Sequence, residues 1–84
     1  MENEILSRKR CDVILALAEC RMNPSDASRM LGIHRNTVIY QIGRIKQLTG
    51  KDPLCFYDLH DLVQYVKAES QRAKIEGGLT NENR

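Results

Sequence analysis

The stretch PSDASRMLGIHRNTVIYQIGRIKQLTG, residues 24–50, decides the fold of this chain. Pro24 suits the first position of a helix, where the N–H that proline lacks would have no partner in any case. Gly32 ends that helix, because glycine adopts the left-handed conformation of a helix C-terminus without penalty. A longer helix follows after three residues and ends before Gly50. Two helices joined by so short a turn predict a helix-turn-helix over about residues 24–49.

Helical periodicity continues on both sides of this motif, and no alternation typical of strands is present. Before the motif, an apolar stripe predicts a helix over about residues 3–20, with Asn3 as its N-cap. After the motif, another stripe predicts a helix over about residues 58–72. We therefore expect an all-α, four-helix domain over residues 3–73, followed by a flexible polar tail over residues 74–84.

Length and composition exclude several classes of protein. With 84 residues, the chain has room for one domain only. Its three cysteines form no C-x-x-C pair, which argues against a disulfide framework and indicates a reducing, cytoplasmic location. No apolar run approaches the roughly 20 residues of a membrane span. Cysteine and histidine lack the spacing of a zinc site, and we expect neither a cofactor nor a small-molecule effector.

Charge is distributed unevenly along the chain, although the net charge is only +2. No acidic residue occurs between Ala27 and Lys51. The basic residues of this window are Arg29, Arg35, Arg44, Lys46 and Lys51. An acid-free basic stretch of this kind indicates a polyanionic partner such as double-stranded DNA.

Residues 34–53 carry a resemblance to a known family through the pattern HRNTVxYxIxRIxxLTGxDP. This run resembles the C-terminal helix-turn-helix of the PucR/CdaR-type (sugar-diacid) transcription regulators. It is more distantly similar to the DNA-binding domain of Fis, the factor for inversion stimulation. The resemblance covers about residues 13–53 and implies a bacterial-type transcription regulator. Ile39 and Gly43 depart from the family, which usually has basic residues at both positions.

The longer helix of the motif, about residues 34–48, is the predicted recognition helix. At 100° per residue, its apolar stripe is buried, and Asn36 and Tyr40 lie on the opposite face. The first residues of such a helix enter the major groove of DNA. Arg35 can donate a forked pair of hydrogen bonds to O6 and N7 of guanine, and Asn36 can pair with N6 and N7 of adenine. The family resemblance also points to Arg35 as the base-reading residue.

Other residues of the motif suit contacts to phosphate or bases. Thr37 and Tyr40 have hydroxyl groups for either contact, although Tyr40 is also suited to packing against a partner subunit. Ser25 and the free N–H groups that open the first helix of the motif form a further phosphate site. His34 fits an N-cap or turn position better than base reading. The predicted DNA-binding residues are Ser25, His34, Arg35, Asn36, Thr37, Tyr40, Arg44, Lys46 and Lys51.

Two functions from different classes follow from these patterns. The first is sequence-specific binding to double-stranded DNA by a transcription regulator that acts as a homodimer. The dimer is expected through the first helix, the fourth helix or both, where Ile5, Leu15, Met22 and Tyr65 lie outside the main apolar stripes. The alternative is a small helical protein–protein interaction module without DNA binding, which the uncharged residues at positions 39 and 43 favour.

An enzyme is the weakest interpretation of the sequence. Asp58, His60 and Asp61 form the one cluster of acid–base side chains, at the start of the predicted fourth helix. The cluster has no nucleophile with a partner, no glycine-rich loop and no metal-binding constellation. We therefore expect no catalytic residues.

Overall fold

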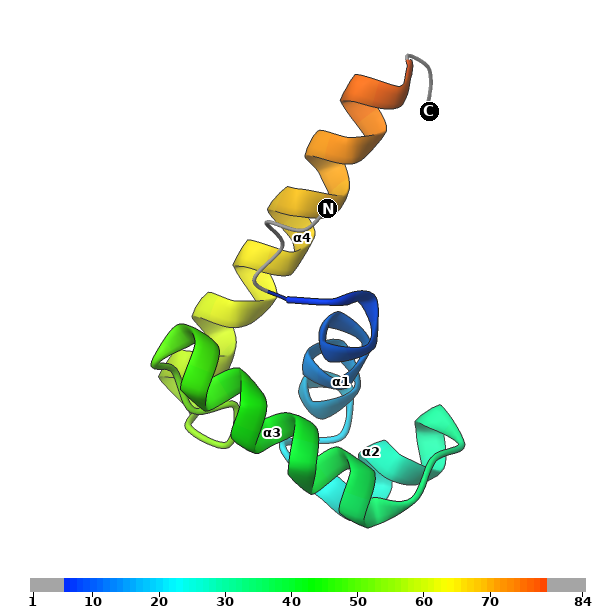
Figure 1. Ribbon diagram of the computed structural model, residues 1–84, viewed down its shortest axis with the longest axis vertical. Helices are drawn as coiled ribbons and strands as arrows, with labels where there is room; N and C mark the ends of the chain where they lie inside the picture. The colour runs from blue at the N-terminus through cyan, green and yellow to red at the C-terminus, as the bar shows by residue number, and fades with distance from the viewer. Residues whose placement is uncertain (1–5, 79–84) are drawn as a thin grey trace.

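The computed structural model describes residues 6–78, which contain four helices (Figure 1). They are α1 (Arg8–Glu19), α2 (Pro24–Leu31), α3 (Arg35–Thr49) and α4 (Phe56–Gly78). No strand occurs within these described residues, so the prediction of an all-α, four-helix fold is confirmed. None of the four helices is long and apolar enough to cross a membrane.

α1 lies at the centre of the fold and packs against each of the other three helices (Figure 1). Its apolar stripe of Val13, Ile14 and Leu17 is completely buried. Because the chain has no Trp and only 5% aromatic residues, the core is built from aliphatic side chains. The other helices contribute Ala27, Val38, Ile42, Ile45, Leu59, Leu62 and Val66 to it.

α1 begins later than the periodicity predicts. Ser7 is its N-cap, with Oγ accepting a hydrogen bond of 3.3 Å from the backbone N–H of Arg10. Leu6, just before the cap, is buried in the core. The predicted start near residue 3 is therefore wrong. The hydroxyl of Ser7 caps the helix at its first turn, and Leu6 packs into the core from outside the helix. Asn3, the expected cap, lies outside the described residues.

The turn between α1 and α2 uses left-handed backbone without a glycine. Arg21 and Met22 have φ of 56° and 66°, in a region that non-glycine residues rarely adopt. The N–H of Met22 donates to the carbonyl of Leu17 at 2.7 Å, which closes the C-terminus of α1. This turn sets the direction in which α2 leaves the central helix.

α4 differs from its predicted bounds at both ends. It begins at Phe56 rather than at residue 58, and Asp58 accepts a hydrogen bond of 3.0 Å from the backbone N–H of Asp52 in the preceding loop. At the other end the helix continues to Gly78, because the intervening sequence RAKIE consists mainly of strong helix formers. The predicted end near residue 72 is wrong, and residues 74–78 are helical rather than part of a polar tail.

Gln41 is a polar residue among the buried side chains of α3, and the apolar stripe did not predict its burial. Only 8% of Gln41 is exposed, and its Oε1 has no hydrogen-bond partner among the described residues. A buried amide oxygen without a donor costs about 1–3 kcal/mol of desolvation. The unpaired oxygen of Gln41 therefore lowers the free energy of unfolding below the value that an apolar side chain of the same size would give.

Replacing Gln41 by Met should raise the free energy of unfolding by about 1 kcal/mol, because Met has a similar length and leaves no unpaired oxygen. Urea unfolding followed by circular dichroism measures this change. Gln64→Met, at an exposed position of α4, is the matched control and should change stability by less than about 0.5 kcal/mol. A less stable Gln41 variant would contradict the unpaired state of the amide oxygen.

Candidate nucleic-acid interface

α2 begins at a capping residue and ends at a glycine, and a short turn joins it to α3, as the sequence predicts. Asn23 caps α2, with Oδ1 accepting from the N–H groups of Ser25 at 2.9 Å and Asp26 at 3.2 Å. Gly32 ends α2 with φ of 71° in the left-handed region, which glycine adopts without strain. Ser28 of α2 is buried, with only 6% of its surface exposed, and α2 packs against α3.

His34 caps α3 with its imidazole. Its Nδ1 accepts a hydrogen bond of 3.0 Å from the backbone N–H of Asn36. The prediction that His34 caps this helix is confirmed. This bond uses the Nδ1 lone pair, and it orients the ring across the first turn of α3.

The two faces of α3 are clearly separated. Val38, Ile42 and Ile45 are buried against the rest of the domain. On the other side, Arg35 and Asn36 are exposed, as is Tyr40 with 61% of its surface. Within the same face, a Cβ added at Gly43 would meet no atom within 4 Å. We call this exposed face, comprising Arg35, Asn36, Tyr40, Gly43, Arg44 and Gln47, the outer face of α3.

Arg35 and Ser25 contact each other directly. The Nε–H of Arg35, the first residue of α3, donates to Oγ of Ser25 in the first turn of α2 at 2.9 Å. The sequence assigned these residues separate roles, one to a base and one to a phosphate. The structure brings the two side chains into one cluster that spans both helices of the motif.

The N–H groups at the start of α2, which the sequence predicts to bind a phosphate, already have hydrogen-bond acceptors. The N–H groups of Ser25 and Asp26 already donate to the side chain of Asn23, and the N–H of Ala27 donates to its carbonyl at 3.0 Å. The expectation that these N–H groups are free is therefore wrong, because the cap satisfies them. What Ser25 still presents is its half-buried side-chain hydroxyl.

The C-terminal part of α3 carries the remaining basic residues of the helix. Arg44 is half-buried and its Nη1 donates to Oε1 of Gln47 at 2.7 Å, while Lys46 is exposed in the last turn. Gln47 was not among the predicted site residues, although the helical angle places it on the outer face. The bond to Gln47 holds the guanidinium of Arg44 along that face.

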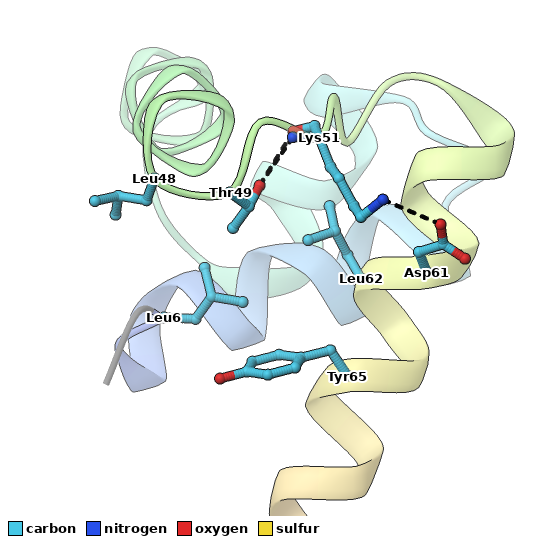
Figure 2. Close-up of a pocket in the computed structure, with 7 residues that line it drawn as sticks. All are labelled: Leu6, Leu48, Thr49, Lys51, Asp61, Leu62 and Tyr65. Carbon is cyan, nitrogen blue, oxygen red and sulfur yellow. Dashed lines mark hydrogen bonds and ion pairs between the residues drawn. The ribbon is translucent and has the colours of Figure 1, made fainter. Parts of the chain in front are cut away.

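Lys51 lies apart from the outer face and has an acidic partner. Its Nζ is 3.2 Å from Oδ2 of Asp61 on α4, as Figure 2 shows. This ion pair lies beside a pocket of about 230 Å³, lined by Leu6, Leu48, Thr49, Leu62 and Tyr65 as well as by the pair itself. The charge of Lys51 therefore already has an acidic partner.

The acid–base cluster at the start of α4 serves the fold. Asp58 holds the preceding loop and Asp61 pairs with Lys51. Among residues 6–78, no group of three or more His, Cys, Asp or Glu side chains is placed to hold a metal ion.

A capped α2, a glycine turn and a longer α3 with a basic, acid-free outer face define a helix-turn-helix DNA-binding domain. The model of the PucR C-terminal helix-turn-helix domain family matches residues 11–68, and the chain belongs to this family. The family comprises DNA-binding domains of transcription regulators rather than enzymes. No curated protein and no solved structure matches the chain.

Replacing His34 by Ala should lower the free energy of unfolding by about 1 kcal/mol, the usual cost of losing a side-chain N-cap. His34→Asn keeps an acceptor at the cap and should retain most of the stability. Thermal and urea unfolding of both variants measure the difference. Equal losses in the two variants would show that the cap hydrogen bond contributes nothing.

Proposed function

We propose that this domain binds specific sequences of double-stranded DNA by inserting the N-terminal part of α3 into the major groove. The observation that carries the proposal is the outer face of α3, which presents Arg35, Asn36 and Tyr40 to solvent with no acidic residue on the helix. An α-helix fits the width of the major groove, and its first residues reach the base edges. The domain then serves a bacterial-type transcription regulator.

Each residue of the outer face has a role that fits its chemistry. Arg35 recognises guanine through a fork of N–H donors, and Asn36 recognises adenine through its amide. Thr37 and Tyr40 offer hydroxyl groups to phosphates or bases, and Arg44 and Lys46 bind phosphates. Ser25 binds the backbone on the other side of the motif, and His34 acts by fixing the first turn of α3. Lys51 contributes least, because Asp61 neutralises it.

One observation favours the second candidate, a protein–protein interaction module. Ile39 is 41% exposed beside Tyr40, and Met30 of α2 is 57% exposed. An apolar interface built on these residues would bind with little dependence on salt. DNA binding must instead weaken steeply as salt rises, because each neutralised phosphate releases counterions. Titration at several salt concentrations separates the two functions.

Selection of binding sites from random double-stranded DNA tests the proposed function. We expect the wild type to enrich a short sequence containing a guanine. Arg35→Ala should lose about 1–3 kcal/mol of discrimination at that base pair while keeping its fold, because the side chain is exposed and leaves no cavity. Lys67→Ala, which removes one exposed charge from α4, should keep the sequence preference. An unchanged preference in Arg35→Ala would exclude the reading role.

We further propose that the domain acts as a homodimer. A single recognition helix reads only a few base pairs, whereas two copies on one face of the duplex read half-sites about 34 Å apart. Leu15 and Met22, two residues of the predicted dimer surface, are half-buried against the domain's own core. Tyr65 remains 41% exposed and lines the pocket of Figure 2 with Leu6 and Leu48, itself 39% exposed. This apolar surface, which Tyr65 of α4 shares with Leu48 of α3, supports the dimer.

Light scattering on the bound complex should therefore report two protein chains per selected DNA site. Tyr65→Glu should give a single chain per site, because it places a charge in an apolar interface. Tyr57→Glu alters the other exposed tyrosine of α4 and should leave the stoichiometry unchanged. One wild-type chain per site would contradict the dimer, and loss of the dimer only in Tyr57→Glu would place the interface elsewhere on α4.

A further inference from the structure

The hydrogen bond between Arg35 and Ser25 joins side chains ten residues apart, on the two helices of the motif. It uses Nε of the guanidinium, and no other described residue bonds to Nη1 or Nη2 of Arg35. Guanidinium has two edges that can donate a forked pair, the Nε–Nη edge at its side and the Nη1–Nη2 edge at its end. Ser25 occupies the first edge and leaves the second one to a ligand.

Ser25 is itself held firmly at this position. Its backbone N–H donates to Oδ1 of Asn23 at 2.9 Å, and its carbonyl accepts from Oγ of Ser28 at 2.7 Å. Ser28 is buried, with 6% of its surface exposed. The backbone of Ser25, which carries the hydroxyl that accepts from Arg35, is therefore held by one hydrogen bond to the exposed cap Asn23 and by one to the buried Ser28.

We propose that Ser25 is a positioning residue for base reading. It holds the Arg35 side chain in one orientation before DNA binds, so that the Nη1–Nη2 edge is directed outward to a guanine. This inference rests on the proposed function and adds to it the residue that sets how selective Arg35 is. The same hydroxyl retains its own hydrogen and can donate it to a DNA phosphate while accepting from Arg35.

The energetic reason lies in the freedom of the arginine side chain. A long side chain with many rotamers loses conformational entropy when it binds, and a contact formed before binding reduces that loss. Fixing the orientation also favours guanine, whose O6 and N7 accept both N–H groups of one edge. A freely moving arginine makes single contacts to other bases or phosphates, and this lowers its discrimination.

A simple phosphate contact by Ser25 makes a different prediction. Phosphates carry no sequence information, so loss of that contact weakens binding to every sequence by the same factor. Loss of a positioning contact instead lowers the preference for guanine at the one base pair that Arg35 reads. The two roles are therefore separable by comparing affinities for the selected site and for the site with that guanine replaced.

The experiment compares Ser25→Ala, Ser25→Thr, Arg35→Ala and the double variant Ser25→Ala/Arg35→Ala on these two sites. We expect Ser25→Ala to reduce the preference for guanine by about tenfold, within the range that one bidentate contact supplies, and Ser25→Thr to restore it. In the Arg35→Ala background, Ser25→Ala should not reduce the preference further. The fold is preserved, because the bonds to Asn23 and Ser28 use the backbone of Ser25.

An equal loss on both sites, or a loss of preference that persists without Arg35, would overturn the positioning role. The Nε–H resonance of Arg35 in the DNA-free protein gives an independent measurement. It should exchange more slowly with water in the wild type and Ser25→Thr than in Ser25→Ala, and equal exchange would refute the contact. If the wild type selects no DNA sequence, the proposed function fails, and the positioning role fails with it even where the resonance shows the bond.

Discussion

Burial of the apolar stripe of α1 is the interaction on which the other helices depend. Val13, Ile14 and Leu17 have no exposed surface, and α1 is the helix that α2, α3 and α4 all contact. α2 has only eight residues, too few to remain helical alone in water. Its stability, and with it the position of Ser25, comes from packing against α1 and α3. The central helix therefore supports the surface that we propose to contact DNA.

The two sides of α3 have different roles. One side of this helix supplies Val38, Ile42 and Ile45 to the core, and the other supplies Arg35, Asn36 and Tyr40 to the proposed DNA contact. Caps at both ends, His34 and Gly50, fix where the helix begins and stops. The positions of these exposed residues along α3 are thus set by the same packing that stabilises the fold.

Local sequence signals predicted the motif well, because caps and turns depend on neighbouring residues. Pro24, Gly32 and Gly50 lie where their backbone preferences place them. What the sequence could not predict depends on contacts between distant segments. The pairing of Lys51 with Asp61 and the bond from Arg35 to Ser25 each join residues ten apart on different elements. Helical periodicity alone does not define how α2 and α3 lie against each other.

The helix ends were less predictable than the helices, again for physical reasons. Ser7 is a strong cap inside a segment whose apolar pattern extends further toward the N-terminus. α4 continues past Val66 to Gly78 (Figure 1), through a stretch that consists mainly of strong helix formers. Gln41 is a polar residue of α3 that is buried although the apolar stripe did not predict it.

The separation of the two faces of α3 also affects which residues of such a domain can change during evolution. Exposed positions tolerate substitution with little change in stability, so Asn36 and Tyr40 can be exchanged without disturbing the core. Under the proposed function, a lineage can therefore acquire a new operator by single substitutions at these positions. Arg35 is different, because its neighbour on α2 is adapted to a guanidinium. Change at that position is expected to occur together with change at Ser25, so the two should covary among descendants of this chain.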